Sequence, residues 1–288
     1  MPYLYLVLSI FTNGICSVVG KYFDKYSFGK KDATKLYNCL QMLASFLIWG
    51  VMYAFNFSFD VNVLPYCLLC AIGYTLSIIG IINAIKHGPV TFAALFTNLA
   101  LIVTSIWGFF FWGTQVTVIV IIGLIFVVLA IFLCLYTGKK EEKKISFKWL
   151  IFILMAFFGN AGCSIAQRSQ QIAFNGEYKY MLMAFAMFIS FVVCFVIYLL
   201  SDKSDSKSIL KKSWHWPVAA GAAAVVLNLM VMLLATSILS PSLVYPAISV
   251  GGLVLVAIFS LFVFKEKLKW WQWVGIVLGT IATALLSI

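Results

Sequence analysis

Ten apolar runs separated by short polar connections dominate the hydrophobic pattern of the chain. Each run has the length of about 20 residues that an α-helix needs to cross the hydrocarbon core of a bilayer. The predicted membrane-spanning helices are residues 2–21, 36–57, 64–86, 89–112, 115–137, 149–173, 177–200, 215–237, 241–264 and 270–288. Because these runs account for nearly the whole chain, the pattern predicts an all-α membrane protein with ten transmembrane helices.

The composition supports the membrane assignment. Hydrophobic residues make up 64% of the 288 residues and charged residues only 10%, whereas soluble domains average roughly 45–50% and 25%. These values exclude a soluble enzyme, a disordered chain and a disulfide scaffold. The first run lacks a positively charged start and a small-residue cleavage site, so we interpret it as a span and not as a signal peptide.

The second half of the chain repeats the first. Residues 65–136 align without a gap with residues 217–288. The identical pairs that mark the repeat include Pro65 and Pro217, Gly123 and Gly275, Asn13 and Asn160, and Cys16 and Cys163. We therefore predict two copies of a five-helix unit, at residues 1–137 and 149–288, joined by a basic linker at residues 138–148.

The basic residues indicate how each copy enters the membrane. Of the 20 Lys and Arg residues, most lie in the odd-numbered connections between runs, and the even-numbered connections are nearly bare. Two units of five spans must have opposite orientations, and the charge bias between equivalent connections reverses as such an inverted repeat requires. The positive-inside rule places the odd connections in the cytoplasm and both termini outside. Short basic clusters beside apolar runs indicate anionic lipid as the partner and no nucleic acid.

Two passages resemble a known family. Residues 245–252 read Tyr-Pro-Ala-Ile-Ser-Val-Gly-Gly, residues 264–268 read Phe-Lys-Glu-Lys-Leu, and residues 272–275 read Gln-Trp-Val-Gly. These motifs resemble the closing two spans of the drug/metabolite transporter superfamily. The first run, from Pro2 to Asn13, resembles the first helix of its four-span small multidrug resistance members. Ten spans in two inverted halves match the ten-span EamA-type branch.

The resemblance implies a secondary transporter with a cavity between the two halves. It implies that Tyr245 contacts the substrate and that the following segment flexes. The small multidrug resistance proteins carry a membrane-embedded Glu that binds protons and cationic drugs, but the matching position here is Asn13, and its repeat is Asn160. An amide cannot exchange a proton, and no Asp or Glu lies at the centre of a predicted span. We therefore expect facilitated diffusion or exchange of a neutral or zwitterionic cargo.

Neutral polar residues remain as candidates for substrate binding. Polar groups at membrane depth are costly unless they are paired, and an amide offers both donors and an acceptor to a substrate. The candidate substrate-binding residues are Asn13, Asn160, Asn98, Asn228, Tyr245, Tyr74, Trp107, Gln167 and Arg168. For each Asn, the alternative is a hydrogen bond to a neighbouring helix.

Two further assignments stay open. Arg168 aligns with Lys21, so it either snorkels to the interface or anchors a substrate carboxylate or phosphate. Pro246, Gly251 and Gly252 serve either as hinges or as sites of close helix packing.

The sequence thus predicts a multi-pass transporter of the bacterial inner membrane, active as a monomer or homodimer. It would move an amino acid, nucleoside or sugar by alternating access. We find no catalytic set and no residues with metal-ligand spacing, so we expect neither an enzyme nor a bound metal or cofactor. Two alternatives remain: a flippase or exporter of a lipid-linked or amphipathic substrate, and a membrane accessory subunit that transports nothing.

Overall fold

A computed structural model describes the chain except for residues 1, 28–29, 89, 113–116, 136–146, 236–247, 249–250, 253, 257, 260, 264, 266–268 and 286–288. All regular structure in the described residues is helical, as predicted. The helices are α1 (Pro2–Tyr26), α2 (Ala33–Phe55), the short 3-10 helix η1 (Val61–Val63), α3 (Leu64–His87), α4 (Val90–Leu99), α5 (Leu101–Phe111), α6 (Val118–Leu135), α7 (Phe147–Ala173), α8 (Lys179–Leu199), α9 (Ser206–Ser213), α10 (His215–Ala235) and α12 (Trp270–Leu285).

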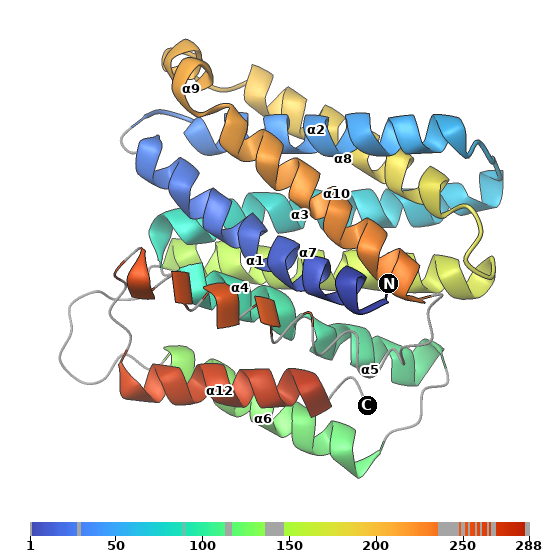
Figure 1. Cartoon of the computed structure of the whole chain (residues 1–288), viewed down its shortest axis with the longest axis vertical. Helices are drawn as coiled ribbons and strands as arrows, with labels where there is room; N and C mark the ends of the chain where they lie inside the picture. The colour runs from blue at the N-terminus through green and yellow to red at the C-terminus, as the bar shows by residue number, and fades with distance from the viewer. Residues whose placement is uncertain are drawn as a thin grey trace.

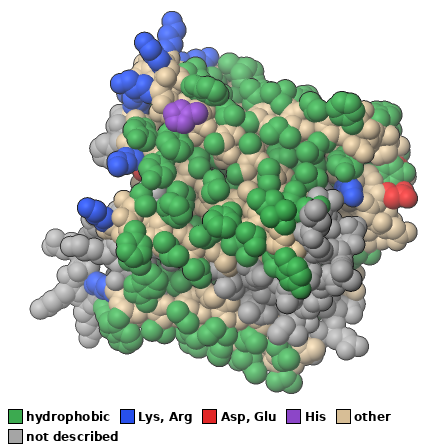
Figure 2. Space-filling model, in the orientation of Figure 1, with side chains coloured by type: hydrophobic (Ala, Val, Ile, Leu, Met, Phe, Trp, Pro, Cys, Tyr) green, Lys and Arg blue, Asp and Glu red, His purple; other side chains and the backbone are tan. Residues whose placement is uncertain are grey.

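Five helical segments are long and apolar enough to cross a membrane. They are α1, α2, η1 with α3, α7 and α8; the pair α9–α10, which bends by 62°, makes a sixth if it is counted as one span. Figure 2 shows hydrophobic side chains over much of the visible described surface, with most of the visible Lys and Arg side chains at one end of the helices. The membrane architecture is therefore confirmed, whereas ten spans are not established. The predicted span at residues 89–112 is divided into α4 and α5, the described parts of the predicted spans 115–137 and 270–288 contain only shorter apolar helices, and the predicted span at residues 241–264 falls largely outside the described residues.

The helices of the two halves pack in a twofold pattern. Helix α3 packs against α7 and α8, and the repeat-related helix α10 packs in the same way against α1 and α2. The remaining strong pairs, α2 with α8 and α6 with α12, each join a helix to its own counterpart in the other half. In Figure 1, α1 and α3 run in one direction and α7 and α10 run in the opposite one. The helices aligned by the sequence repeat therefore point in opposite directions.

Glycines bring α3 and α7 into close contact. A Cβ atom at Gly80 would lie 2.4 Å from the backbone nitrogen of Ala156, and a Cβ atom at Gly159 would lie 2.4 Å from that of Ser77. No larger side chain fits at these distances, and small residues are what permits such backbone approach between membrane helices. This contact sets the rotation of both helices and turns the neighbouring Tyr74 and Asn160 toward the same space.

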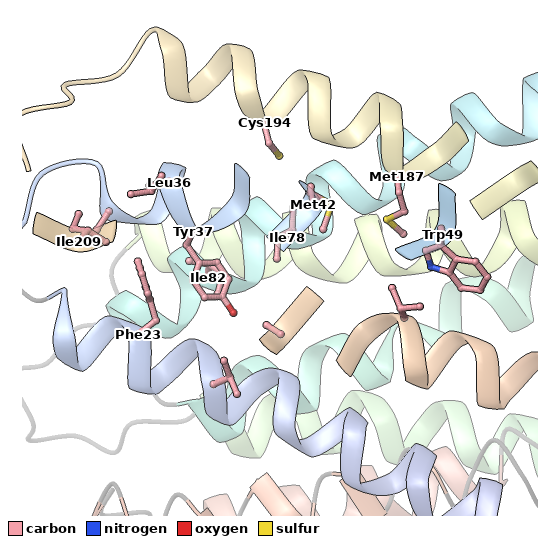
Figure 3. Packing of buried hydrophobic residues seen from close by; sticks show 14 of the residues in the cluster. Phe23, Leu36, Tyr37, Met42, Trp49, Ile78, Ile82, Met187, Cys194 and Ile209 are labelled. Carbon is pink, nitrogen blue, oxygen red and sulfur yellow. The ribbon is translucent and has the colours of Figure 1, made fainter. Parts of the chain in front are cut away.

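The largest buried cluster joins α1, α2, α3, α8, α9 and α10. Trp49, Tyr37 and Phe23 are its largest fully buried side chains. Figure 3 shows Tyr37 reaching from α2 toward α1, with Phe23 and Ile82 beside it. The cluster connects helices from both halves of the chain, so the two halves share one core.

Candidate functional site

A cavity of about 250 Å³ lies among α1, α2, α3, α7 and α10, with Thr97 of α4 and Met187 of α8 at its edge. Five of the predicted substrate-binding residues line it: Asn13, Asn160, Asn228, Tyr74 and Gln167. They come from both halves of the chain; Asn13, Tyr74, Asn160 and Asn228 lie toward the middle of their helices, and Gln167 lies in the last third of α7. The structure therefore brings together residues that are up to 215 positions apart in the sequence, from Asn13 to Asn228.

The cavity lining is polar but uncharged. Amides, hydroxyls and thiols alternate with isoleucine and leucine side chains, and no Asp, Glu, Lys, Arg or His belongs to the described lining. Across the described part of the chain, no three His, Cys, Asp or Glu residues are grouped as a metal site would require. The cavity can therefore form hydrogen bonds to a guest, but it holds no counter-ion for one with net charge.

The two repeat-related asparagines make corresponding hydrogen bonds. Asn160 donates from Nδ2 to the carbonyl oxygen of Thr97 over 2.7 Å, and Asn13 donates from Nδ2 to that of Ile248 over 3.2 Å. Thr97 lies near the end of α4, which Ala100 separates from α5. The last four carbonyls of a helix lack partners within that helix. Each bond joins one half of the chain to the other and leaves further donor and acceptor capacity on the amide.

A chain of hydrogen bonds crosses the cavity through Tyr74. Gln167 donates from Nε2 to Tyr74 Oη over 2.9 Å, and Tyr74 Oη donates to Asn228 Oδ1 over 3.0 Å. Asn228 in turn donates from Nδ2 to the Ala224 carbonyl oxygen of its own helix over 2.8 Å. The Tyr74 hydroxyl is thus the node that connects α7, α3 and α10.

Sequence reasoning missed one face of the cavity. Tyr37, Gln41 and Ser45 of α2 also line it. Their spacing of four residues places them on one helix face, and this spacing of polar residues inside an apolar run was the available signal. Ser45 donates from Oγ to the carbonyl oxygen of Gly221 in α10 over 3.3 Å.

The other predicted residues lie elsewhere. Arg168 is exposed and absent from the described cavity lining. Trp107 is 38% exposed and stacks on Phe111 with ring centroids 4.1 Å apart. The side chain of Asn98 and the residues Tyr245 and Pro246 lie outside the described residues, so their roles stay predictions.

The two predicted hinge glycines lie against α1. A Cβ atom at Gly251 would lie 2.6 Å from Ile10 Cγ2, and one at Gly252 would lie 2.4 Å from Asn13 Nδ2. These distances match the close-packing alternative for both glycines. A hinge function remains a prediction.

A group of hydrogen bonds and an ion pair, called here the polar clasp, joins the α1–α2 connection to the α8–α9 connection. Asp32 Oδ2 accepts a hydrogen bond of 2.9 Å from the backbone N–H of Asp202. The backbone N–H of Lys31 donates to Asp205 Oδ2 over 3.0 Å, and Lys31 Nζ lies 3.4 Å from Asp202 Oδ2. The polar clasp therefore ties the two halves together at the lysine-rich end.

Asp32 and Asp202 of the polar clasp are held in their charged form. Partial desolvation would by itself raise the pKa of Asp32, but the hydrogen bond from Asp202 and the neighbouring Lys35 outweigh it, so the pKa lies below its usual value. Hydrogen bonds from Ser204, first from its backbone N–H, together with Lys31, lower the pKa of Asp202.

The comparisons with known proteins agree with this architecture. The model of the EamA-like transporter family matches twice, at residues 1–136 and 147–288. No curated protein sequence matches the chain at a significant level. A solved crystal structure, titled only as that of a protein, covers 96% of this chain and 95% of its own with a TM-score of 0.61 at 12% identity, which shows a shared fold alone. The resemblance predicted from the sequence is thus confirmed: the chain belongs to the EamA-like transporter family and contains two copies of its domain.

Proposed function

We propose that this membrane transporter carries a small neutral or zwitterionic metabolite through the cavity between its two halves. Family membership supports a membrane transporter. The uncharged lining of the cavity supports the finer assignment of cargo, because a charged guest would lose its hydration there without gaining a counter-charge. That lining is the observation that carries the proposal.

The size of the cavity favours a small guest. Its volume of about 250 Å³ lies just below the range of roughly 300–1,000 Å³ that is usual for pockets binding drug-sized ligands. An amino acid, a monosaccharide or a nucleoside therefore fits the proposal better than a lipid-linked substrate. The wider alternatives, a flippase and an accessory subunit, become outcomes of the test.

The proposed mechanism is alternating access between two inverted five-helix halves. The opposite directions of α1 and α7 (Figure 1) and the twofold pattern of helix contacts support inverted halves, which place substrate sites at the interface between repeats. The polar clasp holds the lysine-rich ends together, so its opening would expose the cavity to that side. The positive-inside rule assigns that side to the cytoplasm.

A binding screen on the purified protein tests the proposal. The thermal unfolding temperature in nanodiscs would be measured with amino acids, nucleosides, monosaccharides and cationic drugs. We expect stabilisation by one neutral or zwitterionic class, since a ligand that binds only the folded state raises its stability. The same ligand should have no effect on Gln167→Ala and should still stabilise the control Trp107→Ala.

Stabilisation by cationic drugs alone would contradict the proposed cargo. Stabilisation by no compound, together with substrate-dependent lipid movement in vesicles, would favour the flippase. The absence of both effects would favour the accessory subunit.

A further inference from the structure

Two polar atoms at the α2 wall of the cavity have no hydrogen-bond partner within the described structure. They are Tyr37 Oη and Gln41 Oε1. Tyr37 is fully buried and Gln41 is 7% exposed, and both side chains belong to the cavity lining. Buried polar atoms are nearly always paired, so this pair calls for a partner that is not part of the chain.

Two neighbouring polar groups of the cavity lining are already bonded. Ser45, one turn further along α2, donates to Gly221, and Tyr74 is bonded on both sides, to Gln167 and to Asn228. The hydroxyl groups of Ser45 and Tyr74 therefore already form hydrogen bonds between helices. Tyr37 and Gln41 differ because their side chains belong to the cavity lining while Tyr37 Oη and Gln41 Oε1 make no such bond.

The spacing along α2 places the two side chains on one helix face beside the same cavity. Tyr37 and Gln41 are four residues apart, so their Cβ atoms lie about 5–6 Å apart on one helix face. Figure 3 shows the Tyr37 side chain extending from α2 toward α1, with its oxygen at the far end. Ile78 and Ile82 of α3 form an apolar wall of the same cavity.

We infer that Tyr37 and Gln41 form a subsite for an uncharged hydroxyl group, which makes a sugar or polyol the substrate class. The Tyr37 hydroxyl donates a hydrogen bond to the ligand oxygen, and the ligand hydroxyl donates one to Gln41 Oε1. This inference rests on the proposed function and narrows it. Both atoms are sealed from solvent in this conformation, so the ligand reaches them when the two halves move apart.

Other functional groups match the pair less well. An ammonium group can donate to Gln41 but cannot accept from Tyr37, and a carboxylate can accept from Tyr37 but cannot donate to Gln41. Each would also bring a charge into a cavity whose described lining holds no counter-charge. A carboxamide can both donate and accept, so the test includes it as a separate arm.

The test measures uptake into proteoliposomes of radiolabelled glucose, ribose and sorbitol, and of alanine and glutamine as the amino-acid and carboxamide arms. Tyr37→Phe removes only the hydroxyl, and Gln41→Met keeps the length of the side chain without its amide. We expect each variant to raise the KM for the hydroxylated probe about tenfold, as loss of one hydrogen bond to a ligand does. A deoxy analogue that lacks the bound hydroxyl should lose affinity in the wild type and lose no more in Tyr37→Phe.

Trp49→Phe is the matched control. Trp49 lies on the same helix and also has an unpartnered buried N–H, but it does not belong to the described cavity lining. We expect this variant to keep the wild-type KM. Size-exclusion profiles and unfolding temperatures of all three variants establish that each is folded.

The outcomes separate the subsite from the proposed function. Uptake of a hydroxylated probe with an unchanged KM in both folded variants would overturn the subsite and leave the transporter assignment in place. Uptake of alanine or glutamine without any hydroxylated probe would overturn the substrate class. Uptake of none of the five probes, when the screen described above also finds no neutral ligand, would overturn both.

Discussion

Asn160 holds the end of α4 by donating from its side-chain amide to the Thr97 carbonyl oxygen over 2.7 Å. The repeat-related Asn13 makes the corresponding bond to Ile248. Each amide crosses from one half of the chain to the other at the edge of the cavity. The two asparagines therefore join the halves at the place where, in the proposed cycle, the halves move relative to each other.

We expect Asn160→Ala to weaken both stability and transport, because it removes the side-chain donor to the Thr97 carbonyl near the end of α4. A side-chain hydrogen bond between membrane helices contributes about 0.6–2 kcal/mol. The unfolding temperature in detergent and the initial rate of uptake would both fall. Asn56→Ala is the control, since Asn56 is exposed and bonds only within its own helix end, to Met52. Equal effects of the two substitutions would show that the bond to Thr97 has no special role.

Substitution of Gly159 should destabilise the α3–α7 contact. A Cβ atom at Gly159 would lie 2.4 Å from the backbone nitrogen of Ser77, whereas one at Gly162 would have its nearest neighbour at 3.7 Å. Overpacking of this kind costs about 1–3 kcal/mol. We expect Gly159→Ala to lower the unfolding temperature and Gly162→Ala to leave it unchanged. An unchanged unfolding temperature in Gly159→Ala would mean that α3 and α7 can move apart without loss of stability.

Tyr74→Phe should disconnect the hydrogen-bond chain across the cavity. The change leaves Gln167 Nε2 and Asn228 Oδ1 without the partner they share, so the two amides become free to rotate. We expect a changed KM for the transported metabolite and a loss of stability of about 1 kcal/mol. Tyr66→Phe on the same helix is the comparison, since Tyr66 packs edge-on against Phe174. An unaltered KM in Tyr74→Phe would remove this residue from the substrate site.

The polar clasp should open at low pH. The folded-state pKa values of Asp32 and Asp202 lie below their usual values. The stability that these two carboxylates give to the folded state is therefore fully present above the ordinary aspartate pKa of about 3.9. It is lost as the pH falls through their lowered folded-state pKa values. Between pH 5 and pH 8, the clasp itself should show no pH dependence.

Distances between spin labels at Lys25→Cys and Lys207→Cys, introduced into a chain without other cysteines, would report the opening of the polar clasp. At pH 7 we expect a short distance in the parent chain and a longer or broader one in Asp202→Asn. A clasp that stays closed in Asp202→Asn would assign the contact between the halves to other groups.

The sequence was sufficient to predict the helices that are both long and apolar, such as α2 and α7. It also paired Asn13 with Asn160, because the two copies of the repeat carry the same polar residue at equivalent positions. Polar residues are costly inside a membrane, so such a match is easy to recognise. Helix α1 continues to Tyr26, beyond the predicted end at residue 21, because a helix that leaves the membrane can carry charged residues such as Asp24.

Three features could not be predicted, for physical reasons. The break at Ala100 occurs in a stretch with no Pro or Gly, so no local signal marks it; the bond from Asn160 to Thr97, which forms only in the folded protein, lies beside it. Trp107 and Arg168 turn away from the cavity because packing sets the rotation of each helix. Tyr37 was missed because a tyrosine close to the start of a span is equally typical of the membrane interface.

Counterflow in proteoliposomes tests the central claim most directly. Vesicles loaded with an unlabelled neutral or zwitterionic metabolite should transiently accumulate the same labelled metabolite from outside. This accumulation should not need a pH gradient and should be lost in the Asn13→Ala, Asn160→Ala double variant. Accumulation only of a cationic compound, and only with a pH gradient, would contradict a neutral cavity that alternates between the two sides.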